Sequence, residues 1–428
     1  MRCLFFYILI FSKICCRSQD LDFNKDILPI IKMNCTPCHN KNAGLPFKLE
    51  NYKDIASRIK TIEYVINKRI MPPWKADKEY THFNNEKFLS QEEICKINTW
   101  IKNGNLSKGN NKIKISDSNF TAYGIEKPDL VIDSKINIKI LPSIRDTFVY
   151  IEFPYKINTA HYISDYEIVM TNKTNIHHVL FDIFSDSTLN FFKSSSIKFE
   201  NVKNSGNTFN IMILDYSKLA FGGGWVPGQY PFTLPVGVAY YLPSRGKILI
   251  YLHFAPTNKE LNTRFKIKLR YTKDIVERTA MGYRVGSEGE DPPFPPMYFP
   301  EESIKKYTCE SILNKDMSIF SIGPHMHYIG KTFLAYAIKP NKDTIPLIKI
   351  NDWDFNWQQY YTPKKFIYLT KGTIIHIEGV FDNTSTNDKN LYSPPKLITE
   401  GSHTYNEMLQ FNLFYVPYKP GDENVILK

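Results

Sequence analysis

Residues 247–254 read KILIYLHF, a short run of β-branched and aromatic side chains with a histidine near its end. Two other runs have the same character, TFVYIEF at 147–153 and GTIIHIEGV at 372–380. Turn residues separate these runs, and this pattern is typical of β-sandwiches. The region that contains them has about 300 residues, which is more than one small sandwich holds. We therefore expect two stacked all-β sandwiches of the jelly-roll type.

The two sandwiches are predicted at 126–285 and 286–422. The proline-dense stretch GSEGEDPPFPPMYFP at 286–300 is the natural joint between them. The stretch NLSKGNNKIKISDSNF at 105–120 is polar and rich in Asn, Lys and Ser, so we place a linker at 107–125. The chain is therefore predicted to be multidomain, with the β region after the linker.

The segment 20–106 is predicted to be an all-α domain. Ser90 and Glu93 stand at the two positions of a capping box, in which each side chain accepts from the backbone of the other residue. Apolar side chains then recur at helical spacing, at Ile94, Ile97 and Ile101. Gly104 supplies the C-terminal stop.

Residues 1–18 are expected to be a secretory signal peptide. The apolar run LFFYILIF at 4–11 follows Met1 and Arg2, and it is shorter than the roughly 20 residues that span a bilayer. We therefore expect an exported protein, periplasmic or secreted, without stable membrane insertion after cleavage. The net charge of +11 comes mostly from scattered Lys, so a solvated surface is favoured over nucleic-acid binding.

The seven cysteines exclude a disulfide framework. Three lie in the expected signal peptide, and Cys35 and Cys38 belong together. Only Cys95 and Cys309 remain. The sequence is compatible with a disulfide bond between these two cysteines, but it favours two free buried thiols.

Cys35-Thr-Pro-Cys38-His39 is a C-x-x-C-H motif, which predicts covalent attachment of one c-type haem with His39 as the proximal iron ligand. A zinc site would need more Cys or His nearby, and a thioredoxin-like pair would need a βαβ context. Met71, in Ile-Met-Pro-Pro-Trp, is the favoured sixth ligand. The alternatives are that His82 is the sixth ligand of the iron or that no side chain occupies this position. The stretch from Cys35 to Gly104 resembles the small cytochromes c.

Histidines in the β region cluster in the sequence rather than scatter. They occur as His177-His178, as His253, and as His325-Met-His327. On a strand, residues i and i+2 share a face, so His325 and His327 can hold one ion. Adjacent histidines point to opposite faces of a flat strand, so His177 and His178 can share an ion only at a bulge or a strand end. A thioether in one of the two sites would favour reduced copper.

The region from about residue 128 to 418 resembles the type II copper, ascorbate-dependent monooxygenases, the family of peptidylglycine α-hydroxylating monooxygenase and dopamine β-hydroxylase. Three histidine motifs stand in the order of that family, as NIHHVL, LHF and GPHMH. GSHTYNEM at 401–408 stands at its methionine motif. Fusion of a cytochrome c ahead of such a domain resembles a group of bacterial proteins.

The resemblance implies two copper ions in an open cleft between the sandwiches. His177, His178 and His253 would bind the electron-storing copper. His325, His327 and Met408 would bind the copper at which O2 is activated, and they are the implied catalytic residues. This chain lacks the cysteines for the disulfides of the animal members. His403 lies unexpectedly close to Met408.

The leading hypothesis is a copper monooxygenase that hydroxylates a C–H bond of a small organic or peptide substrate with O2. The electrons would come from an external donor, either an ascorbate-like reductant or a donor acting through the covalent haem. The alternative is a non-catalytic haem and copper protein for electron transfer or copper binding. A dihaem peroxidase ranks last, because the chain has one C-x-x-C-H motif. His161 and His376 are interpreted as structural.

Overall fold

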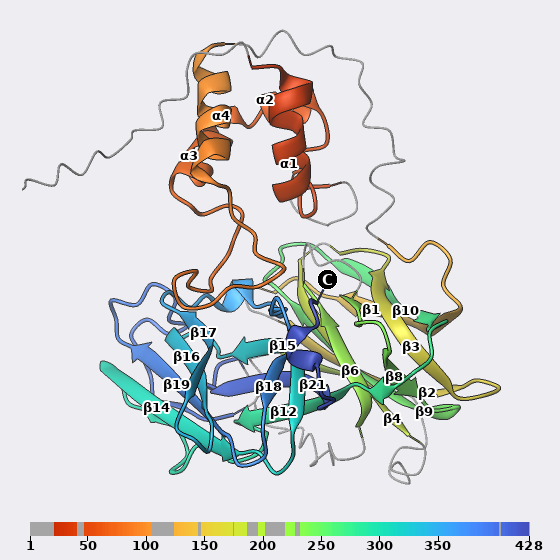
Figure 1. Ribbon diagram of the computed structural model, residues 1–428. Coiled ribbons are helices and arrows are strands. Elements are labelled where there is room, and N and C mark those ends of the chain that lie inside the picture. Colours follow the sequence, from red (N-terminus) through yellow and green to blue (C-terminus); the bar gives the residue numbers. More distant parts are fainter. Residues whose placement is uncertain are drawn as a thin grey trace, which may run out of the picture. The chain divides into compact units, whose positions relative to one another are not determined.

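The protein is described here by a computed structural model (Figure 1). It describes residues 21–40, 47–104, 124–143, 147–173, 175–185, 196–201, 219–226, 232–401 and 404–427. The predicted signal peptide, most of the predicted linker and His403 lie outside these residues. No helix among the described residues is long and apolar enough to cross a membrane.

The described residues form two compact units. The smaller unit contains 21–40, 47–73 and 87–104, and the larger unit contains 74–86 together with the described residues from 124 onward. Residues 74–86 therefore pack with the β region, whereas the sequence placed all of 20–106 in one domain. The reason is that their backbone and apolar side chains pair with the second sandwich.

The smaller unit is helical. Its elements are η1 (Phe23–Ile27), α1 (Leu28–Asn34), α2 (Tyr52–Ala56), α3 (Ile59–Asn67) and α4 (Gln91–Lys102). The predicted capping box is confirmed, because Ser90 Oγ accepts from Glu93 N at 3.1 Å and Glu93 Oε2 accepts from Ser90 N at 2.7 Å. Trp100 of α4 is 1% exposed and packs near Phe23, with ring centroids 5.5 Å apart.

The first sandwich consists of two sheets. One has the order β1-β10-β3-β8-β11, with β7 beside β3. These strands are β1 (Leu130–Ile140), β10 (Leu261–Tyr271), β3 (His161–Met170), β8 (Val238–Leu242), β11 (Arg278–Thr279) and β7 (Phe232–Thr233). The other has the order β5-β2-β9-β4-β6. These strands are β5 (Ser196–Asn201), β2 (Thr147–Lys156), β9 (Arg245–Phe254), β4 (Ile176–Ser185) and β6 (Leu219–Trp225).

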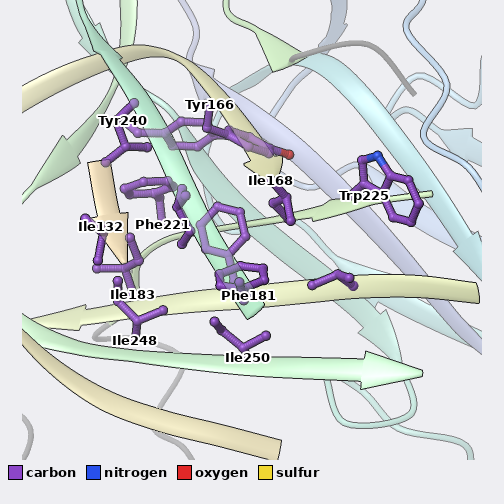
Figure 2. Close-up of a cluster of buried hydrophobic side chains, with 14 of the residues drawn as sticks. Ile132, Tyr166, Ile168, Phe181, Ile183, Phe221, Trp225, Tyr240, Ile248 and Ile250 are labelled. Carbon is purple, nitrogen blue, oxygen red and sulfur yellow. The ribbon is translucent and has the colours of Figure 1, made fainter. Parts of the chain in front are cut away.

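The core of the first sandwich fills the space between its two sheets (Figure 2). Phe181 of β4 and Ile250 of β9 are fully buried, and Tyr166 of β3 packs against Phe181 with ring centroids 5.1 Å apart. The KILIYLHF run lies in β9 with alternate residues in this core, so its prediction as a strand is confirmed.

The second sandwich also has two main sheets. One has the order β12-β21-β15-β18, from β12 (Met281–Gly286), β21 (Gln410–Pro417), β15 (Met317–His325) and β18 (Ile367–Leu369). The other has the order β14-β19-β16-β17, from β14 (Ser303–Ile312), β19 (Ile374–Asn383), β16 (Gly330–Ile338) and β17 (Thr344–Ile350). A short pair, β13 (Tyr298–Phe299) and β20 (Ile398–Thr399), and the 3-10 turns η7 (Phe355–Trp357) and η8 (Asp422–Asn424) complete it.

The chain passes from one sandwich to the other at Ala280. β11 pairs with β8 of the first sandwich, and β12 pairs with β21 of the second. The proline-dense stretch 286–300, which the sequence suggested as the joint, instead follows β12 within the second sandwich. Strand pairing sets this boundary, and the amino-acid composition of a stretch does not reveal how its strands pair.

Cys95 and Cys309 do not pair with each other. Cys309 is buried and free, and Cys95 is disulfide-bonded. The sequence-based preference for two free thiols is therefore wrong at Cys95.

Candidate metal centre

The first histidine group lies where β4 meets β9. His178 is directly opposite His253 in the antiparallel ladder, and the register shifts between Ile176 and His178. His177 lies at this irregularity, as the adjacency argument required, although its side chain is outside the described residues. Asn175, just before it, has φ of 60° and accepts at its carbonyl from Ala255 N. The local bend that two adjacent histidine ligands need is therefore present.

Two imidazole nitrogens converge in this group. His178 Nδ1 and His253 Nδ1 are 3.4 Å apart, and the rings are tilted by 74°. Two nitrogens that share a tetrahedral ion at about 2.0 Å lie about 3.3 Å apart. His253 is 1% exposed and stacks on Phe148 at 4.4 Å between ring centroids. The spacing fits a shared metal ion, and the stacking fixes one of the rings.

The second histidine group lies at the end of β15. His325 is the last residue of the strand, so His327 follows the strand rather than lying on it. The intervening Met326 is fully buried in the core, while the rings of His325 and His327 lie 5.0 Å apart. The two imidazoles therefore approach each other, and a turn rather than a strand pleat places the second one.

Hydrogen bonds orient both rings of the second group. His325 Nδ1 donates to Gln358 Oε1 at 2.5 Å, and His327 Nδ1 donates to the carbonyl of Asn406 at 3.1 Å. These bonds assign Nε2 as the metal-binding nitrogen of each ring. Burial lowers the pKa of His325, which favours the neutral imidazole that binds a metal.

Glu407 joins the second histidine group to the methionine motif. Its carboxylate accepts from the backbone N–H groups of His327 at 2.9 Å, Ile329 at 2.8 Å and Met408 at 3.3 Å. Glu407 is 1% exposed, and burial raises its pKa to about 8. Met408 itself is 4% exposed. No role was predicted for Glu407 from the sequence, although it directly precedes the predicted ligand Met408 in the GSHTYNEM motif.

Phe355 of η7 contacts both histidine groups. Its ring centroid lies 6.4 Å from His178, 5.5 Å from His253 and 5.8 Å from His327. Its side chain is 2% exposed. One aromatic ring therefore lies between the two groups, and no sequence pattern pointed to it.

Each group supplies two described nitrogens, and a third ligand is needed. Within the described residues, no three His, Cys, Asp or Glu side chains gather closely enough to hold a metal. The third ligands that the sequence predicted are the His177 imidazole, which is not described, and the Met408 thioether. The donor chemistry of both groups fits copper, because imidazole suits copper and a thioether favours its reduced state.

His376 and His161, which lie outside both groups, have structural contacts. His376 pairs with Glu310 at 2.8 Å and stacks on Tyr336. His161 stacks on Tyr271 with ring centroids 3.8 Å apart. Both contacts agree with the structural interpretation.

The C-x-x-C-H motif follows α1. Cys35 is the C-cap of that helix, and neither Cys35 nor Cys38 forms a disulfide. His39 Nδ1 donates to the carbonyl of Phe47 at 3.2 Å, which assigns Nε2 as its metal-binding nitrogen. Met71 belongs to the same compact unit as His39, whereas His82 belongs to 74–86, is exposed and pairs with Glu86.

No curated protein matches the sequence. Two solved structures of PNGF-II, in the P21 and C2 space groups, match 67% and 65% of this chain at 7% and 9% identity with TM-scores of 0.18 and 0.17. The matches cover 60% and 58% of those chains, less than two thirds, and TM-scores this low carry no argument about fold. Residues 295–424 match the family model described as copper type II ascorbate-dependent monooxygenase, C-terminal domain. The second sandwich is thus similar to the C-terminal domain of that copper monooxygenase family.

Proposed function

We propose that this protein is an exported copper-dependent monooxygenase that hydroxylates a C–H bond of a small organic or peptide substrate with O2. The observation that carries the proposal is the pair of convergent imidazole groups on either side of Phe355. The match of residues 295–424 to the copper monooxygenase model supports it.

Two copper sites follow from this proposal. His177, His178 and His253 hold one ion, and His325, His327 and Met408 hold the other. When bound, copper at the methionine-containing site supplies O2 activation, and copper at the three-histidine site supplies the second electron.

The surrounding side chains set the geometry of these ligands. Gln358 and the carbonyl of Asn406 fix the tautomers of His325 and His327. Glu407 holds the backbone of the His327 turn beside Met408. The buried Phe355 ring packs against side chains of both groups.

A covalent haem c is part of the proposal. Cys35 and Cys38 carry it, His39 is the proximal ligand and Met71 is the sixth ligand. A thioether ligand raises the haem potential relative to two imidazoles. When bound, the haem would supply electron transfer from an external donor in the periplasm or outside the cell. The alternative is that an ascorbate-like reductant would reduce copper directly.

Two measurements test the proposal. Elemental analysis of protein matured in a host competent for cytochrome c should give iron and copper in a ratio near one to two. O2 uptake should require both a reductant and an organic substrate, with one atom of labelled O2 recovered in the product. Zinc in place of copper under copper-replete conditions, or uptake that ignores substrate, contradicts it.

The variant Met408→Ile isolates the proposed oxygen-activating site. It should abolish hydroxylation while the three-histidine site still binds copper, because only one ion loses a thioether. Met170→Ile makes the same change at a buried methionine in the core of the first sandwich and should keep activity. Equal activity of the two variants contradicts the assigned ligand set.

A further inference from the structure

Residues 74–86, called the strap below, are built into the second sandwich. The strap forms two antiparallel bridges, Ala76 with Ile350 and Phe83 with Pro363. Asp77 N donates to the carbonyl of Lys349 at 2.7 Å. The backbone of the strap therefore pairs with both ends of segment 350–363.

Aromatic packing anchors the same contact. Trp74 meets Tyr361 with ring centroids 5.2 Å apart, and Phe83 meets Tyr361 at 5.0 Å. Phe83 is 2% exposed and Tyr361 is 1% exposed. Ala76 and Phe83 of the strap therefore belong to the core of the larger unit, and Trp74 packs against that core.

Asn85 holds the backbone on both sides of Tyr361. Its Nδ2 donates to the carbonyl of Tyr360 at 2.8 Å, and its Oδ1 accepts from Thr362 N at 3.1 Å. Tyr361 in turn exchanges two backbone hydrogen bonds with Ile322 of β15, at 2.8 and 2.9 Å. Segment 360–362 is therefore held by the strap on one side and by β15 on the other.

The chain just before this segment carries Gln358, the hydrogen-bond partner of His325. Gln358 lies two residues before Tyr360, whose ring covers Gly323 so closely that an added Cβ there would approach it to 2.7 Å. Gly323 lies two residues before His325 on β15. The position of Gln358 relative to His325 therefore depends on how 360–362 is seated on this strand.

We propose that the strap is a positioning element of the second histidine group and that Asn85 is its central positioning residue. Asn85 acts through segment 360–362 on Gln358, which selects the Nδ1-protonated tautomer of His325. The consequence for copper rests on the proposed function, whereas the consequence for the tautomer does not. A segment from within the predicted helical domain thus contributes to the support of a site in the last sandwich.

The first test needs no metal. In the full-length metal-free protein with 15N-labelled histidine, proton–nitrogen NMR reports which ring nitrogen of His325 is protonated. The wild type should show His325 protonated at Nδ1, and Asn85→Ala should show a mixture of tautomers. Asn67→Ala is the matched control, since it removes an amide of the smaller unit that bonds Asn98 and Glu63, and should change nothing at His325.

A milder variant guards against loss of folding. Asn85→Asp keeps an acceptor for Thr362 N but replaces the donor that faces the carbonyl of Tyr360, so it should shift the tautomer in the same direction with near wild-type thermal stability. An unchanged His325 signal in both Asn85 variants overturns the proposal.

Copper loading separates this inference from the proposed function. Electron paramagnetic resonance of Cu(II) at the second histidine group should change in Asn85→Ala, with about a 10- to 100-fold loss of affinity as for other supports of metal ligands. The signal of the first group should stay the same. If the wild type binds no copper while the tautomer still shifts, the proposed function fails and the strap's positioning role stands. If copper binds to both proteins alike and the tautomer is unchanged, the strap is only structural.

Discussion

The two histidine groups are assembled by different means. His178 and His253 face each other across one antiparallel ladder, so strand register alone brings them together. His325 and His327 lie at the end of a strand and in the turn after it. Residues far along the chain hold this second pair, namely Gln358, Asn406 and Glu407. The first group therefore depends on the pairing of two adjacent strands, and the second on hydrogen bonds from distant parts of the sequence. Substitutions of residues that are not ligands should therefore disrupt the second group more easily.

The largest effect should come from Glu407→Ala. It removes the acceptor of three buried backbone N–H groups, and each unsatisfied donor costs about 1–3 kcal/mol. We expect the free energy of unfolding to fall by at least about 3 kcal/mol and copper binding at the second group to be lost. Urea denaturation and copper titration measure the two effects.

The control for Glu407 is Glu310→Ala. Glu310 is also a carboxylate that pairs with a histidine, but it is exposed and lies outside both groups. It should change stability little. Equal destabilisation by the two variants would show that the Glu407 hydrogen bonds are unimportant.

Removing a ligand of the first group should affect that group alone. His253→Ala deletes one of the two converging nitrogens, so copper affinity there should fall by more than the roughly 100-fold typical of a lost support. The second group should load normally, because its ligands come from other strands. His161→Ala, a stacked histidine outside both groups, is the control. Loss of copper from both groups in His253→Ala would break the distinction between them.

Changing the partner of His325 should have a smaller effect. Gln358→Ala leaves every ligand in place but removes the acceptor of the Nδ1 proton, so copper affinity of the second group should fall by about 10- to 100-fold. Gln359→Ala, the adjacent amide, contacts Tyr361 instead and should bind copper like the wild type. Equal affinities for Gln358→Ala and the wild type would show that the second group needs no such support.

The smallest effect concerns the connection between the sandwiches. Arg278 of β11 pairs with Asp422, which also accepts from Ser318 of β15 at 2.5 Å. Burial by itself raises the pKa of Asp422, but the bonds from Arg278 and Ser318 outweigh it and hold that pKa below its ordinary value. Because the folded-state pKa is lowered, this carboxylate stabilises the fold above its ordinary value of 3.8 and loses that contribution as pH falls through the folded-state pKa.

The variant Asp422→Asn should flatten this acid dependence. Thermal unfolding measured between neutral pH and pH 3 should show a steeper loss for the wild type than for the variant. Copper binding to both histidine groups at neutral pH should be retained. Parallel pH profiles would mean that Asp422 contributes nothing to the connection.

Much of the organisation was predicted from the sequence because its signals are local. The capping box at Ser90, the β-branched and aromatic run at 247–254 and the two-residue spacing of His325 and His327 each report on a few neighbouring residues. The joint was predicted at 286–300, whereas the structure has it at Ala280. The sheet that a strand joins depends on its pairing with β8 or β21, which lie far away along the chain.

The sequence by itself determined which side chains can bind metal, because imidazole, thioether and thiol chemistry belongs to the residue type. It also required a bend at His177, since neighbouring side chains on a flat strand point apart. Only the tertiary structure decided that His178 faces His253, that Phe355 lies between the two groups, and that Gln358 and Glu407 support the second. Those contacts join residues tens of positions apart, and no local pattern encodes them, because they exist only once distant strands and turns have come together.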